Sequence, residues 1–248
     1  MTTYDMDIRA LPESERILYN QLQQRFRLHF SRERFGGHAL RLLMPSDLEE
    51  LLEGRDPFAD VSQFPFWSRL WEAARVLAEV LVATVGSPPG RLLELGAGLG
   101  APGLAAAAAG YQVVLSDYEQ SIVDFQRISA AANGLTDVRC VLLDWLAPPE
   151  MERFDVLAGA EVLFREEFVE PLLWICENYL QPGGIVYLAH DVRRQCLPVF
   201  LRAAQERFVI GSRKQSLTRD GHTVDILVNR LQLRRDQRER EKRTDGRK

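Results

Sequence analysis

The sequence predicts an α/β fold: a doubly wound, mostly parallel sheet of seven strands, with an antiparallel C-terminal hairpin and an N-terminal helical extension. Two observations predict it. Five short apolar runs alternate with amphipathic helical segments between residues 91 and 207, as in parallel strands joined by crossover helices. Two further runs, residues 208–215 and 223–231, flank Arg219-Asp220-Gly221, a turn signal that places a hairpin at the sheet edge.

The N-terminal zone, residues 1–65, is expected to be an extension that covers the site as a lid. A helix is predicted over residues 13–30, because apolar side chains at helical spacing mark one face of it. These side chains are Ile17, Leu22, Phe26 and Phe30. Gly36-Gly37 then breaks the chain, and a second helix is predicted over residues 68–84, where apolar residues recur every three or four positions.

The body, residues 66–232, is expected to form one domain in which strands and helices alternate. The parallel strands are predicted at residues 91–95, 112–116, 138–143, 154–159 and 185–189. Helices are predicted from the glycine-rich turn to residue 109 and at residues 121–133, 166–180 and 197–207. Pro182-Gly183-Gly184 predicts a sharp turn just before the fifth strand.

Composition excludes several classes of protein. With 248 residues, 46% hydrophobic and 27% charged, the chain is neither wholly disordered nor fibrous, and no apolar run reaches the roughly 20 residues of a membrane helix. The N-terminus lacks the basic start and apolar core of a secretory signal. Three widely spaced cysteines form no metal or disulfide pattern, so we expect a reducing cytoplasm. The sequence carries no signal for the oligomeric state, and a monomer is the default expectation.

Charge is unevenly distributed along the chain. Residues 234–248 hold eight Lys/Arg and four Asp/Glu, whereas the whole chain carries a net charge of −4, so the body is acidic. An acidic body argues against nucleic acid as the main partner. The tail, residues 233–248, is expected to be solvated and disordered.

A glycine-rich turn carries the strongest local signal. Leu92-Leu-Glu-Leu-Gly96-Ala-Gly98-Leu-Gly100 has the sequence of a strand, then a turn, then the start of a helix. Glycines allow the backbone to approach a ligand closely, and the helix start supplies unpaired amides. Alone, this turn is compatible with S-adenosylmethionine, with a dinucleotide, or with a purely structural role.

Acidic residues at the strand ends favour the first of these ligands. Glu94 precedes the glycines and suits a cofactor that carries an amino group, whereas it is poorly placed against a pyrophosphate. Asp117 ends the second strand, where it can bind both ribose hydroxyls. Asp144 and Trp145 follow the third strand and can bind and cover an adenine. The alternatives are a turn cap for Asp144 and core packing for Trp145.

Together these residues resemble the class I, seven-β-strand S-adenosylmethionine-dependent methyltransferases, whose sheet is Rossmann-like. The segment 94–100 looks like the first motif of that superfamily, Asp117 and Asp144 match its ribose and adenine acids, and residues 180–184 look like the turn before its fifth strand. The resemblance implies S-adenosyl-L-methionine as cofactor and S-adenosyl-L-homocysteine as product. The cofactor-binding residues it implies are Trp71, Glu94, Gly96, Gly98, Gly100, Asp117, Tyr118, Asp144, Trp145 and Ala160.

Two segments resemble one particular family within this superfamily. Phe66-Trp-Ser-Arg-Leu-Trp71 and Glu161-Val-Leu-Phe164 are similar to the protein-lysine methyltransferases that carry an Asp/Glu-x-x-Tyr/Phe motif after strand four. The resemblance implies that Glu161 and Phe164 line the acceptor site, with Glu161 orienting the amine. The alternatives are a carboxylate at a helix start for Glu161 and core packing for Phe164. His190, at the end of strand five, is expected at the surface or near the acceptor.

The predicted function is therefore methyl transfer to a lysine side chain of a protein substrate. The motif of enzymes that methylate adenine or glutamine amides is absent, with Glu161-Val-Leu-Phe164 in its place. A small-molecule N-, O- or S-methyltransferase is the alternative. A dinucleotide-dependent oxidoreductase and a non-catalytic cofactor-binding scaffold rank lower.

Overall fold

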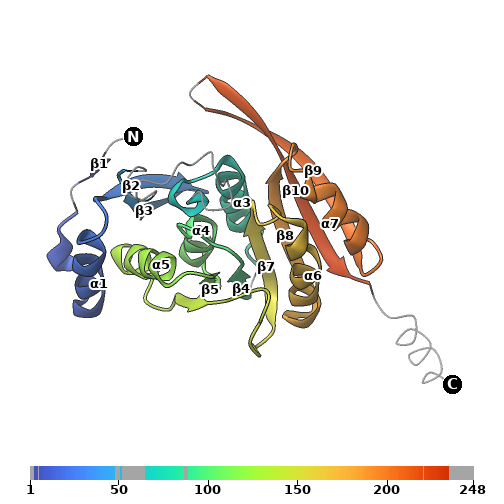
Figure 1. Ribbon diagram of the computed structural model, residues 1–248, viewed down its shortest axis with the longest axis horizontal. Helices are drawn as coiled ribbons and strands as arrows, with labels where there is room; N and C mark the ends of the chain where they lie inside the picture. The colour runs from blue at the N-terminus through green and yellow to red at the C-terminus, as the bar shows by residue number, and fades with distance from the viewer. Residues whose placement is uncertain are drawn as a thin grey trace.

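The computed structural model describes residues 3–4, 6–47, 51, 65–86, 89–219 and 221–234. A seven-stranded sheet with the strand order β6-β5-β4-β7-β8-β10-β9 forms its centre (Figure 1). Its strands are β4 (Arg91–Glu94), β5 (Gln112–Asp117), β6 (Arg139–Leu142), β7 (Phe154–Ala160), β8 (Leu180–Asp191), β9 (Phe208–Arg219) and β10 (His222–Leu233). Strands β4 to β8 pair in parallel, and β10 pairs antiparallel with both β8 and β9. The predicted fold class is confirmed.

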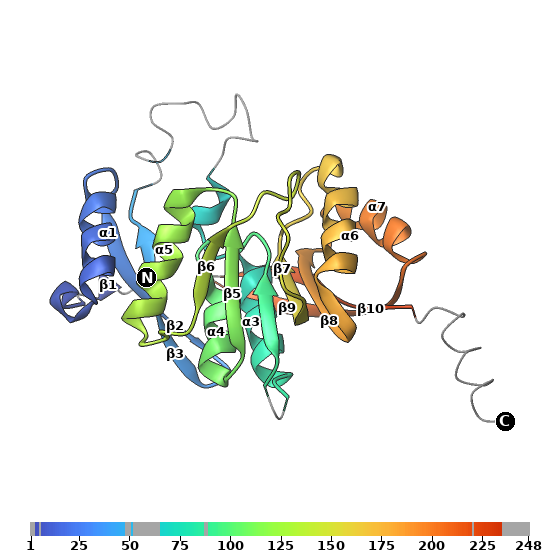
Figure 2. The same ribbon diagram turned by 90° about the horizontal axis from the view of Figure 1, so that it is seen from below.

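Helices cover both faces of this sheet. Along β4, Leu92 contributes to one apolar core and Leu93 to the other, because successive side chains of a strand point to opposite faces. The first core contains α3 (Glu72–Ala83) and α4 (Ala101–Ala109), with α5 (Gln120–Ala132) beside them; the second contains α6 (Val169–Asn178) and α7 (Cys196–Ala204). The two groups of helices lie well apart in Figure 2.

The N-terminal zone differs from the prediction. Helix α1 spans Glu13–Gln23, followed by β2 (Leu28–Phe35) and β3 (His38–Pro45), which form a three-stranded antiparallel sheet with β1 (Thr3–Tyr4). The predicted helix over residues 13–30 is therefore wrong beyond residue 23. The break at Gly36-Gly37 is the hairpin turn between β2 and β3, where both glycines have positive φ.

This N-terminal unit packs on the outer side of α5. The backbone amide of Leu43 donates to Ser129 Oγ at 2.9 Å, and the amide of Arg41 donates to Asn133 Oδ1 at 2.8 Å. Figure 1 places α1 and β1–β3 at the end of the molecule opposite to the hairpin β9–β10. The lid predicted for residues 1–65 stays a prediction, since much of residues 48–64 lies outside the described part of the chain.

Smaller elements complete the chain. Short 3₁₀ turns occur at η1 (Ile8–Ala10), η3 (Phe66–Ser68) and η4 (Glu166–Phe168), so the helix predicted from residue 68 begins only at Glu72. The predicted turn at residues 182–184 is an irregularity inside β8, because the register jumps from Phe154 opposite Leu180 to Val156 opposite Ile185. No helix in the described ranges is long and apolar enough to span a membrane. The predicted tail lies almost wholly outside the described residues.

Candidate active site

The glycine turn between β4 and α4 has the backbone conformation that its glycines permit. Gly96, Gly98 and Gly100 have φ values of +56°, +52° and +74°, a region that other residues rarely enter. A Cβ on Gly96 would lie 3.0 Å from the Trp145 ring. The turn therefore brings bare backbone to the sheet edge. Gly100 precedes α4 as its N-cap residue, a Cβ on it would lie 2.9 Å from Leu115, and it does not line the cavity described below, so its predicted role in cofactor binding stays a prediction.

Glu94 ends β4 with a fully buried carboxyl group. One carboxyl oxygen accepts a hydrogen bond from the Gly103 amide at 2.7 Å. Within the described residues this carboxyl has no ion pair, and burial raises its pKa to about 8, because a low-dielectric environment disfavours the charged form. A cationic ligand beside Glu94 would restore the charged form.

Asp117 ends the neighbouring strand β5 and is 5% exposed. Its two oxygens accept hydrogen bonds from the Gly98 amide at 2.8 Å and the Tyr118 amide at 2.9 Å. Burial raises its pKa to about 6 in spite of these bonds. A carboxylate has about four lone-pair positions, so Asp117 retains acceptor capacity for two hydroxyl groups. Tyr118 next to it is 72% exposed, with its ring free to cover a bound ligand.

Asp144 and Trp145 follow β6, as predicted. Asp144 is exposed and accepts a hydrogen bond from the Leu146 amide at 2.9 Å, so the turn-cap role is present. Trp145 is partly buried and packs edge-on against Phe168, with 5.4 Å between ring centroids. Its other side faces Gly96. The pair thus forms an aromatic wall with a polar group at its edge, which suits a flat heterocycle.

Trp71 precedes α3 as its N-cap residue and also lines the cavity. Its indole nitrogen donates to the Phe66 carbonyl at 2.7 Å, and the Arg69 guanidinium lies 4.7 Å from the centre of its ring. These contacts fix the ring orientation. Trp67 packs against Phe125 with 5.0 Å between ring centroids.

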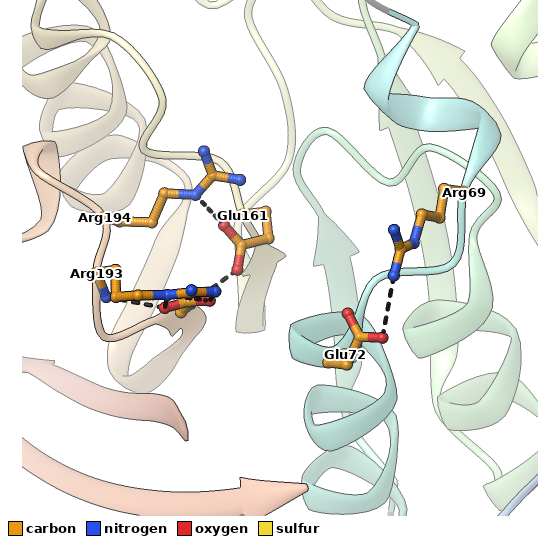
Figure 3. Close-up of polar contacts among 6 residues, drawn as sticks. Arg69, Glu72, Glu161, Arg193 and Arg194 are labelled. Atoms are coloured by element: carbon orange, nitrogen blue, oxygen red, sulfur yellow. Dashed lines mark hydrogen bonds and ion pairs between the residues drawn. The ribbon is translucent and has the colours of Figure 1, made fainter. Parts of the chain in front are cut away.

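Glu161 follows β7 in an unusual conformation. Among the described residues it is the one residue other than glycine with positive φ, +57°. Its amide donates to the Ala189 carbonyl at 3.0 Å, one carboxylate oxygen accepts from the Asp191 amide at 2.7 Å, and the other pairs with Arg194 (Figure 3). Such conformations cluster at functional sites.

Phe164 and His190 lie on either side of this turn. Phe164 is 46% exposed and packs edge-on against Phe168, so it is not a core residue. His190 is fully buried, which corrects the surface position expected for it. Its Nε2 accepts a hydrogen bond from the Leu163 amide at 3.2 Å, and burial lowers its pKa to about 3. His190 therefore stays neutral, and its hydrogen bond with the Leu163 amide stabilises the turn that follows β7.

These residues converge on one cavity of about 430 Å³ at the carboxyl ends of β4, β5 and β7. This is where open α/β sheets bind ligands, and its volume is in the usual range for small-molecule sites. Every predicted site residue lines it except Gly100. The prediction missed several further lining residues, namely Phe66, Arg69, Leu143, Phe168 and Arg194. No motif in the sequence marks Arg194 as a site residue, because only the folded chain brings it next to Glu161.

Comparisons with known proteins agree with this geometry. The model of a family described as lysine methyltransferase matches residues 65–207. The chain is 33% identical over 141 residues to a mouse histone-arginine methyltransferase, METTL23, covering 52% of this chain and 53% of the relative. It is 28% identical over 171 residues to a Xenopus tropicalis protein N-lysine methyltransferase, METTL21A, covering 66% of this chain and 77% of the relative. The chain thus spans about half the length of the mouse relative.

Solved structures support the fold. A crystal structure of an S-adenosylmethionine-dependent methyltransferase from Agrobacterium tumefaciens aligns with a TM-score of 0.59 at 16% identity, over 82% of this chain and 70% of that one. At this identity the likeness concerns the fold alone.

Proposed function

This chain belongs to the lysine methyltransferase family, and from that premise we propose that it transfers a methyl group from S-adenosylmethionine to a lysine side chain of a protein substrate. The observation that carries the proposal is Glu161, a carboxylate fixed in a strained turn at the edge of the cavity. Aromatic side chains flank it, which suits an amine that must lose its hydration before it reacts.

The cavity fits the cofactor that the family and the fold imply. When bound, S-adenosylmethionine supplies a methyl group activated on a sulfonium. Glu94 would hold its amino group, since this buried carboxyl has no cationic partner among the described residues. Asp117 would bind the ribose hydroxyls. Trp145 and Asp144 would enclose the adenine, and Gly96 leaves room for it where a Cβ would crowd the Trp145 ring.

The acceptor side must bring a lysine to the cavity in its neutral form. An ammonium has no lone pair, and the ordinary pKa of lysine is about 10.4, so the amine must release one proton to solvent before it can accept a methyl group. Two features of the site lower the pKa of an incoming amine: desolvation by the aromatic rings that line the cavity, among them Phe164 and Trp71, and the positive charge of Arg194, which offsets the charge of Glu161. Glu161 retains lone pairs beyond its two existing bonds, so it can accept a hydrogen bond from the amine and hold it in line with the methyl group.

The test is transfer of a radiolabelled methyl group into a cell lysate. We expect acid-stable label on protein, which elutes as methyl-lysine after hydrolysis. Glu161→Gln should lower turnover about 100-fold, the usual cost of misplacing a reacting group, while the dissociation constant of S-adenosylmethionine changes little. Glu167→Gln, at an exposed glutamate outside the cavity, is the matched control. Label only in the small-molecule fraction would contradict the proposal.

An arginine side chain is the second candidate acceptor, because the mouse relative with 33% identity is named a histone-arginine methyltransferase. A guanidinium is larger and much harder to deprotonate than an ammonium. The same hydrolysate separates the two candidates, since methyl-arginine and methyl-lysine elute apart. Methyl-arginine as the labelled product would replace the lysine assignment.

A further inference from the structure

A second cavity of about 560 Å³ opens beside the first. Its walls are the η3–α3 segment, the loop after β8, and the outer part of the β9–β10 hairpin, represented by His222 and Val224. Both cavities are lined by Trp71, Glu161 and Arg194, so they meet at the proposed acceptor position. The inference below concerns this outer cavity and rests on the proposed function.

Ion pairs on two walls of the outer cavity share one arrangement, with the carboxylate inside and the guanidinium outside. Arg193 pairs with Asp191 at 2.5 Å, and their side chains are 79% and 17% exposed. Arg69 pairs with Glu72 at 3.3 Å, and their side chains are 59% and 16% exposed. Although each charge is balanced locally, the groups that reach solvent are the cations.

The pair at the junction of the two cavities follows the same arrangement. Arg194 is 30% exposed and Glu161 10% exposed. Figure 3 shows Arg194 and Arg193 on one wall, with Arg69 facing them from the other. Three guanidinium groups therefore surround the route to the acceptor position.

These guanidinium groups keep unused hydrogen-bond donors. A guanidinium has five N–H groups. Within the described residues, Arg194 uses only Nε, toward Glu161, and Arg193 uses Nε and Nη2, toward Asp191. The terminal nitrogens left over can bind a carboxylate from outside, often in a bidentate manner.

We propose that the outer cavity binds an acidic segment of the protein substrate, with Asp or Glu side chains close to the acceptor residue in sequence. Each substrate carboxylate meets one guanidinium of the rim. Nucleic acid fits less well, because the guanidinium groups are separate points that alternate with Glu72 and Asp191 and form no continuous basic track for a phosphate chain, and the protein as a whole carries a net charge of −4.

The test measures binding of two dye-labelled twelve-residue peptides to the full chain by fluorescence anisotropy at 20 and 150 mM salt. One peptide has a central lysine flanked by four aspartates, and the other has asparagine in place of each aspartate. We expect the acidic peptide to bind roughly tenfold tighter, with a smaller difference at high salt, since exposed ion pairs are weak singly and screened by salt.

Arg193→Gln should weaken binding of the acidic peptide roughly two- to fivefold, as expected for one exposed charge pair, and leave the asparagine peptide unchanged. Arg9→Gln is the matched control, because Arg9 pairs with Asp7 in the same two-residue spacing and is also highly exposed, at 87% against 79% for Arg193, but lies outside both cavities. Equal affinity for the two peptides, equal effects of the two variants, or stronger binding of a twelve-nucleotide oligothymidylate would each overturn the inference.

The binding assay needs neither cofactor nor methyl transfer, so its failure differs from failure of the proposed function. If the chain methylates protein in the lysate but does not prefer the acidic peptide, the proposed function stands and the inference about acidic segments is wrong. If the chain prefers the acidic peptide but methylates no protein, it has a binding surface for acidic segments that plays no part in substrate choice. That result also overturns the inference.

Discussion

Replacement of Glu161 by alanine and by glycine should separate two properties of this residue. Both changes remove the carboxylate and its bonds to the Asp191 amide and Arg194. They differ in the backbone, because alanine must keep the φ of +57° with a Cβ, whereas glycine adopts it freely. Both variants lose the same contacts, so the difference between their free energies of unfolding reports the backbone strain at this position.

The expected difference follows from the backbone energies. An L-residue in the left-handed region costs about 1–2 kcal/mol relative to its ordinary conformations. Glycine loses more chain entropy on folding, which costs about 0.5–1 kcal/mol relative to alanine. The Glu161→Gly variant should then be more stable than Glu161→Ala by about 0.5–1 kcal/mol, and both should lose methyl transfer.

Urea unfolding followed by tryptophan fluorescence measures this difference. Gly134→Ala is the matched control, because Gly134 has φ +67° and a Cβ there would meet nothing within 4 Å. A Cβ at this position meets no neighbour, so the same balance of backbone strain against chain entropy applies, and alanine should destabilise by the same amount. If Gly134→Ala destabilises as expected while Glu161→Gly is no more stable than Glu161→Ala, the turn at Glu161 is not strained and the reasoning is refuted.

Three further outcomes follow from the buried groups. The charged form of Asp117 binds hydroxyl groups, and its pKa is about 6. Affinity for S-adenosylmethionine, measured by calorimetry, should therefore be about tenfold lower at pH 5 than at pH 7. Asp117→Asn should weaken binding and remove most of this pH dependence. Burial raises the pKa of Glu94 to about 8, so the folded chain holds this proton more tightly than the unfolded chain. The resulting stabilisation is complete below about pH 4.5 and is lost as the pH rises through 8. The thermal stability of Glu94→Gln relative to the native chain should therefore increase from about pH 5 to about pH 8. Gly103→Ala should destabilise by about 1–3 kcal/mol in thermal unfolding, although alanine favours helices, because the new Cβ would lie 2.3 Å from Leu115.

The strand order of the body could be predicted because its local signals agree with one another. Apolar runs, crossover helices and the Asp220-Gly221 turn all indicate the same sheet. The N-terminal hairpin was missed because Phe26 and Phe30 continue the spacing of the preceding helix. Both are buried, as predicted, but from a turn and from β2. A spacing of four places side chains on one face of a helix, and an even spacing also places them on one face of a strand.

The site could be predicted where its residues follow strand ends in the sequence, as Asp117 and Trp145 do. The arginines at the acceptor side could not, because Arg69 and Arg194 are far apart in the sequence and line the same cavities only once the chain is folded. The bonds of Glu161 were also beyond sequence reasoning, since they depend on a positive φ that a glutamate rarely adopts.

The distribution of charge unites the two cavities. Strands β5, β4 and β7 are neighbours in the sheet. Asp117 and Glu94, which end β5 and β4, carry buried carboxyl groups, and the side chain of Glu161, which follows β7, is 10% exposed. Backbone amides hold all three, and in the described part of the chain only Glu161 has a cationic partner, Arg194. The inner cavity therefore suits the ammonium and the sulfonium of the cofactor, whereas the incoming amine meets Glu161 together with its partner Arg194. The arginine rim outside it suits an anionic segment, so a substrate that presents one lysine among acidic residues complements both cavities at once.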